Sequence, residues 1–157
     1  MAAENRIANI TLDEKSVIRR SPQVEHERKV AIFDLLDENE FSLKDGAAGP
    51  YSLHLRIEEN RLIFDVRLED DSGLAEVTLP TSTFRRTVKD YFMICDSYFE
   101  AIKTKTPSQI EAIDMARRGL HNEGAELLKE RMEDRVEMDR QTARRLFTLV
   151  CVLHIRA

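Results

Sequence analysis

The sequence has few cysteines, glycines and prolines, and it has no long apolar run. Its 157 residues include two cysteines, five glycines and four prolines, which excludes a fibrous or low-complexity chain. No segment approaches the roughly 18 apolar residues of a membrane-spanning helix, and residues 1–15 have no apolar signal region. We therefore expect one cytoplasmic domain, residues 1–157, with no membrane role.

The two cysteines have no metal-binding spacing. Cys95 and Cys151 each lie inside an apolar segment, "YFMICDSYF" and "LFTLVCVLH", where a thiol behaves as a small hydrophobe. A reactive cysteine is the alternative, and it needs exposure and a nearby base. We expect two free, buried thiols, and no metal or cofactor.

The charge balance is acidic. The chain has 24 Lys and Arg against 29 Asp and Glu, a formal net charge of -5, whereas nucleic-acid binding usually needs a basic face. A nucleic-acid role is therefore disfavoured. The chain also has no glycine-rich phosphate loop, nucleophile elbow, HExxH or paired-carboxylate motif, which weakens an enzymatic function without excluding one.

Alternating apolar residues predict strands in two places. Residues 5–12 form a short first strand, and residues 51–79 form an antiparallel meander. A two-residue turn at Glu59–Asn60 places Tyr51 opposite Leu68 on an apolar face. On the other, charged face it places His54 opposite Asp65 and Ser52 opposite Arg67, and a turn at "DDSG" brings Glu76 beside Arg67. An imidazole beside a carboxylate suits base chemistry, but mixed charges on a solvated sheet explain this face adequately.

Helical periodicity and capping residues predict the other elements. The expected helices span residues near 22–39, after Ser21 as a cap, and then 82–104, 107–132 and 140–154. Thr106 and Gln109 form a capping box for the third helix, and Asp139 caps the fourth. The apolar end of the fourth segment, residues 146–155, fits a buried helix or a central strand, and we choose a helix. The fold class is α+β: an antiparallel β-meander with helices packed on one face.

An apolar stripe runs along the segment 82–104. Its members share helical spacing: Phe84, Val88, Tyr91, Cys95, Tyr98 and Ile102. The stripe fits the core of a single domain, and it also fits a dimer seam. The sequence therefore leaves open whether the protein forms a homo-oligomer.

Long runs of the chain match one known family. They are "VEHER", "LHLRIEENRLIFDVR", "FRRTVKDYFMICDSYFEAI", "TPSQIEAIDMARRGLHNEGAELLKERM" and "TARRLFTLVCVLH". Over nearly all of residues 5–156 the chain resembles a family of small alphaproteobacterial proteins catalogued only as an uncharacterised protein family. The resemblance implies a bacterial, cytoplasmic source, and it brings no catalytic residue, cofactor or partner with it.

The segment "PTSTFRR", residues 80–86, is the first candidate anion site. Its hydroxyls and arginines gather at a helix start, where free backbone N–H groups and the helix dipole favour a phosphate or a carboxylate. The candidate ligands are Thr81, Ser82, Thr83, Arg85 and Arg86. The alternative is that the hydroxyls cap the helix and the arginines are solvated or paired.

Arg117 marks the second candidate. It falls inside the apolar arc of the segment 107–132, with His121 at the edge of the arc, so we expect it to be substantially buried and paired. In a structural interpretation Arg117 is a pin to a neighbouring segment. In that interpretation Gly119 and Gly124 serve only tight packing. In a functional one, Arg117, His121, Asn122 and Glu123 line a cleft for an acidic ligand or a partner side chain, and Gly124 lets a backbone or a ligand come close.

These patterns favour a non-enzymatic cytosolic binding or regulatory module for a protein partner or a small anion. The alternative is a small enzyme acting on a phosphorylated or carboxylated substrate, with His121 as acid/base and Arg117, Arg85 and Arg86 as anion holders. Whether Arg117, His121 and the start of the helix 82–104 converge on one pocket separates the two.

Overall fold

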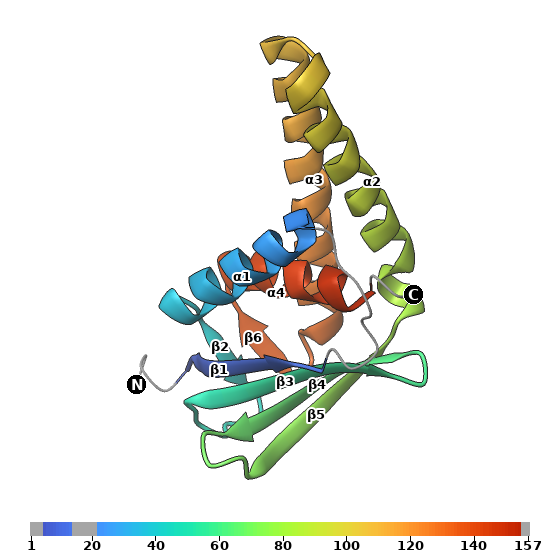
Figure 1. The fold of residues 1–157 in the computed structure, drawn as a ribbon. Coiled ribbons are helices and arrows are strands. Elements are labelled where there is room, and N and C mark those ends of the chain that lie inside the picture. The colour runs from blue at the N-terminus through green and yellow to red at the C-terminus, as the bar shows by residue number, and fades with distance from the viewer. Residues whose placement is uncertain (1–4, 14–21, 155–157) are drawn as a thin grey trace.

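The computed structural model describes residues 5–13 and 22–154 of the chain. They form a β-sheet layer with the helices above it (Figure 1), which confirms the predicted α+β class. In chain order the elements are β1 (Ile7–Leu12), α1 (Pro22–Asp37), β2 (Phe41–Leu43), β3 (Tyr51–Glu58), β4 (Arg61–Leu68), β5 (Gly73–Pro80), α2 (Ser82–Thr104), α3 (Pro107–Met132), β6 (Val136–Met138) and α4 (Arg140–Leu153).

The main sheet has the strand order β1-β3-β4-β5. Glu59 and Asn60 turn β3 into β4 with φ values of 52° and 63°, the left-handed pair that a two-residue hairpin needs. The predicted register is confirmed, since Tyr51 lies opposite Leu68 and His54 lies opposite Asp65.

The predicted position of Glu76 is wrong. Glu76 lies opposite Asp65, and Arg67 lies opposite Gly73, because the turn closes between Leu68 and Ser72, earlier in the chain than predicted. A register shift between Val66 and Arg67 then places one extra residue in β5 and moves the remaining pairs by one position. The Glu76 carboxylate instead lies 3.4 Å from Nη2 of Arg56.

Strand β1 pairs in parallel with β3, which requires a crossover, and α1 supplies it. Asn39, just after α1, connects α1 to β1 through its side chain. Its Oδ1 accepts from Ile7 N at 2.7 Å, and its Nδ2 donates to Ile7 O at 2.9 Å and to Leu35 O at 2.7 Å. The proposed cap, Ser21, lies outside the described residues.

A second, two-stranded sheet pairs β2 with β6, and the sequence interpretation missed both strands. Each strand has three residues, which is too short for an alternating apolar pattern to be recognised in the sequence. The pairing of Phe41 with Met138 joins the chain after α1 to the connection between α3 and α4.

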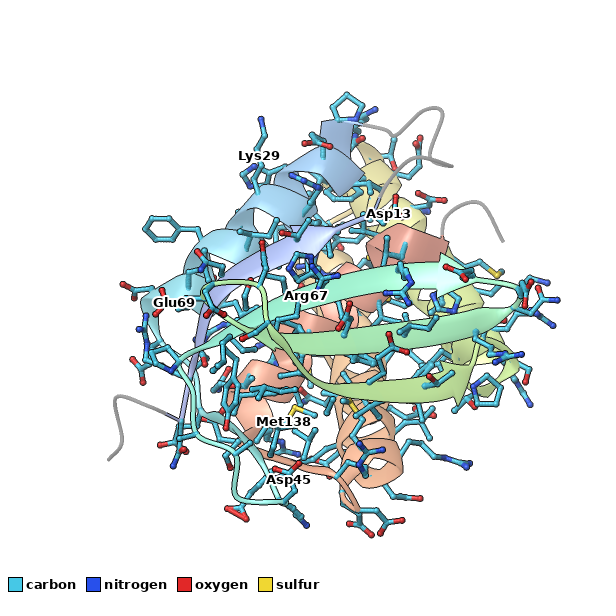
Figure 2. The ribbon with its side chains drawn as sticks, turned by 90° about the horizontal axis from the view of Figure 1, so that it is seen from below. Asp13, Lys29, Asp45, Arg67, Glu69 and Met138 are labelled. Carbon is cyan, nitrogen blue, oxygen red and sulfur yellow. The ribbon has the colours of Figure 1, made fainter. Side chains whose placement is uncertain are left out.

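The helices cover one face of the main sheet and bury its apolar side chains, including Leu53, Phe64 and Val66. The other face is charged, and Figure 2 shows it from outside, with Arg67 labelled. There the Asp65 carboxylate accepts from Arg67 at 2.7 Å.

Helices α2 and α3 form a hairpin that projects beyond the body of the molecule (Figure 1). The predicted bounds of both helices are confirmed, as is the capping box of Thr106 and Gln109. The apolar stripe on α2 is core as far as Cys95, while Ile102, close to the tip, is 51% exposed. None of the described helices is both long enough and apolar enough to span a membrane.

Candidate functional site

Arg117 joins three helices. Its Nη2 donates to Asp114 Oδ1 at 2.7 Å within α3, its guanidinium carbon lies 4.1 Å from the ring centroid of Tyr98 on α2, and its Nη1 lies 3.9 Å from a Glu27 oxygen on α1. The side chain is 22% exposed, so it is less buried than the apolar arc predicts. These contacts match the structural interpretation, in which Arg117 is a pin.

His121 is held by α4. Its Nε2 lies 2.9 Å from the Arg144 carbonyl oxygen and 2.9 Å from Thr148 Oγ1. Because a carbonyl only accepts, Nε2 carries the proton and Nδ1 is the acceptor. Nδ1 faces Nη2 of Arg144 at 3.5 Å. Burial, and then the charge of Arg144, lowers the pKa of His121 to about 4, so the imidazole is neutral at pH 7.

The ring of His121 also packs among aromatic residues. It stacks on Tyr91 of α2, with ring centroids 5.4 Å apart, and lies 5.8 Å from Phe147 of α4. Such packing holds the ring in a fixed orientation. His121 therefore joins α2, α3 and α4.

The residues after His121 differ in their surroundings. Asn122 is half-buried and Glu123 is exposed. Gly124 is buried, and a Cβ built there would overlap the ring of Phe147. The close approach at this glycine is thus made by a core side chain, not by a ligand.

The segment "PTSTFRR" lies far from Arg117. Thr81 is buried and its hydroxyl donates to Asn60 O at 3.0 Å, so it makes no side-chain cap. The Arg86 side chain is 95% exposed. Thr83 precedes Tyr98, the residue that contacts Arg117, by 15 positions on α2, about 22 Å along a helix. The two predicted groups therefore do not converge on one pocket.

The two cysteines are buried and free, as predicted. Burial raises the pKa of the Cys95 thiol to about 11 and raises that of Cys151 well above its ordinary value. A thiol in such surroundings is almost entirely protonated at pH 7, which suits a core residue and not a nucleophile.

A cleft with a volume of 210 Å³ lies between α1 and α4, which run side by side (Figure 1). We call it the α1–α4 cleft. Each of these helices contributes positions i, i+3, i+4 and i+7, which form one helical face. The lining residues are Glu27, Val30, Ala31 and Asp34 of α1, His121 of α3, and Gln141, Arg144, Arg145 and Thr148 of α4. Of the residues predicted as ligands, this cleft contains His121.

Arg144 is incompletely satisfied. Its Nε is buried and has no hydrogen-bond partner among the described residues, and there its Nη2 has only the long contact to His121. Leaving a buried donor unpaired costs about 1 to 3 kcal/mol, and more when the group is charged. Neighbouring Arg145 donates from Nη1 to Glu38 O at 3.3 Å, at the end of α1.

Charges of opposite sign face each other across the cleft. Glu27 and Asp34 lie on the α1 wall, and Arg144 and Arg145 lie on the α4 wall. Within residues 5–13 and 22–154, no ion pair of 4.0 Å or less joins the two walls. The charges are therefore close enough to line one space but do not neutralise each other directly.

The sequence interpretation missed Arg144 and Arg145. One signal was available: they interrupt a segment, 142–153, whose other residues are all buried. A pair of arginines in such a helix is typical of a polar face set into the core. Their α1 neighbours gave no comparable signal, because they come together with Arg144 only through tertiary packing.

Comparisons with known proteins place the chain in a family. The model of Uncharacterised protein family UPF0262 matches residues 4–156. A protein of this family from Paramagnetospirillum magneticum is 60% identical over 156 residues, covering 99% of each chain. One from Rhodospirillum rubrum is 59% identical, covering 97% of this chain and 94% of the relative. No solved structure matches the chain. The chain therefore belongs to Uncharacterised protein family UPF0262.

Proposed function

We propose that the protein is a non-enzymatic cytoplasmic binding module that holds a small carboxylate in the α1–α4 cleft through Arg144. The incomplete bonding of Arg144 carries the proposal. In the part of the chain that the structure describes, its Nε lacks a partner, although Arg144 lines 210 Å³ of free space. A rotation of the guanidinium toward the cleft lets Nε and Nη2 grip a carboxylate in two places, the strongest geometry that arginine offers.

The surroundings of His121 favour binding over catalysis. Both ring nitrogens already face α4, Nε2 toward the Arg144 carbonyl and Nδ1 toward the Arg144 guanidinium. With a pKa of about 4, the ring has almost no proton to give at pH 7, so it is a poor general acid. Its short hydrogen bond to the Arg144 carbonyl oxygen fixes the backbone of α4 at this residue, while the 3.5 Å contact to the guanidinium leaves that group able to rotate.

The carboxylate is either a free molecule or a side chain of a partner protein. The exposed apolar residues next to the cleft are Val30 and Phe33 on α1, of which Phe33 is 71% exposed. A free molecule needs only the cleft, whereas a partner protein also covers Phe33. The variant Phe33→Ser separates these sources, because it weakens binding of a partner protein and leaves binding of a free carboxylate unchanged.

Thermal unfolding in sodium acetate, with sodium chloride at equal ionic strength as the reference, tests the proposal. We expect acetate to raise the melting temperature of the wild type and to leave that of Arg144→Met unchanged, because a ligand that binds only the folded state stabilises it. The double variant with Arg85→Ala and Arg86→Ala is the control and should respond like the wild type. An equal acetate response in wild type and Arg144→Met would refute the proposal.

A further inference from the structure

The α1 wall of the cleft carries carboxylates whose positive partners are few. Asp34 has no ion pair or side-chain hydrogen bond within the described parts of the chain, and the contact of Glu27 with Arg117 is 3.9 Å long. An anion alone, placed against Arg144, would also face these two carboxylates. In a cleft partly shielded from water, that repulsion is stronger than in open solvent.

The α4 wall is the positive counterpart. Arg144 and Arg145 follow each other on α4 and line the same space as Asp34, and no ion pair between described residues crosses the gap. A molecule that carries one charge of each sign satisfies both walls at once. Between the charged residues of α1 lie Val30 and Ala31, which offer an apolar surface to the carbon chain of such a molecule.

The volume of the cleft limits the size of the ligand. An engineered cavity of about 150 Å³ binds benzene, so 210 Å³ suits a molecule of amino-acid size and not a nucleotide or a folded segment. We infer that the ligand is a small zwitterion, an amino acid in the chemical sense, whose carboxylate meets Arg144 and whose ammonium group meets Asp34. This inference rests on the proposed carboxylate site.

A series of probes tests the two charges separately. Isothermal titration calorimetry at constant ionic strength compares acetate, ethylamine and the zwitterions glycine, β-alanine, 4-aminobutyrate and 6-aminohexanoate. We expect at least one zwitterion to bind ten-fold or more tightly than acetate and ethylamine, and the preferred chain length to match the gap between the walls.

Variants test which residue binds each charged group of the zwitterion. Asp34→Asn should weaken binding of the preferred zwitterion about ten-fold and should not weaken acetate binding, because it removes a carboxylate that repels the anion, whereas Arg144→Met should abolish both. Asp37→Asn is the matched control, because Asp37 lies on the same helix outside the cleft, and it should change neither.

The outcomes separate this inference from the proposed function. If acetate binds as tightly as every zwitterion, or if Asp34→Asn leaves zwitterion binding unchanged, the inference is wrong and the carboxylate site stands. If neither acetate nor any zwitterion binds, both are wrong.

Discussion

The two glycines of α3 allow a matched test of the packing between α3 and α4. A Cβ at Gly124 would overlap the ring of Phe147, which is fully buried, whereas a Cβ at Gly119 would meet no heavy atom within 4 Å. Replacing a glycine by alanine inside a helix stabilises it by about 0.5 to 1 kcal/mol. Overpacking a core costs about 1 to 3 kcal/mol, occasionally more.

The two substitutions should therefore differ in sign. We expect Gly119→Ala to raise the free energy of unfolding by about 0.5 to 1 kcal/mol, and Gly124→Ala to lower it by about 1 to 3 kcal/mol. Urea unfolding followed by circular dichroism measures both. Gly124→Ala should lower the free energy of unfolding less in a Phe147→Leu protein than in the wild type, because the smaller leucine leaves space for the added Cβ. If Gly124→Ala is as stable as Gly119→Ala, Phe147 does not occupy the space that the structure assigns to it.

Three further predictions concern residues that the sequence singled out. Arg117→Met should lower the free energy of unfolding by about 1 to 2 kcal/mol, since it removes a partly exposed ion pair and a cation–π contact with Tyr98; a loss above 3 kcal/mol in urea would mean a fully buried partner. The pKa of His121 is about 4 in the fold, against 6.5 in the unfolded chain, so the unfolded chain binds more protons between these values. The contribution of neutral His121 to the free energy of unfolding should be complete above pH 6.5, and about 3 kcal/mol of it should be lost as the pH falls from 6.5 through 4. His121→Gln should remove this part of the pH dependence. If the variant and the wild type show the same pH profile of stability, the prediction is wrong. Cys95 and Cys151 should react with a thiol reagent only in denaturant, and fast labelling of both in the native protein would show that they are not buried.

Capping residues and short turns made much of the fold predictable. Thr106, Gln109 and Asp139 mark helix starts through hydrogen bonds within four residues, and the Glu59–Asn60 turn sets the β3–β4 register by local backbone geometry. Such signals are complete in the sequence, because all the interacting groups lie close together along the chain.

The α1–α4 cleft could not be predicted in this way. Its two helical walls lie more than 100 residues apart in sequence, and the hydrogen bonds between α4 and the residues after α1 are tertiary: Glu40 N donates to Thr142 Oγ1 at 2.9 Å, and Arg145 Nη1 donates to Glu38 O at 3.3 Å. The register shift in β5 and the parallel pairing of β1 also depend on partners outside the local segment. Arg117 drew attention because it breaks an apolar arc, but its partners are Asp114 on its own helix, Tyr98 on α2 and Glu27 on α1.

The side-chain resonances of arginine test the central claim most directly. In a ¹⁵N–¹H spectrum, the Nε–Hε signal of Arg144 is identified by its loss in Arg144→Met, and the signal of exposed Arg86 is the internal reference. Titration with acetate should shift the Arg144 signal saturably and leave the Arg86 signal in place. A titration in which the Arg144 signal stays unchanged, or moves only in proportion to Arg86, would contradict a carboxylate site in the α1–α4 cleft.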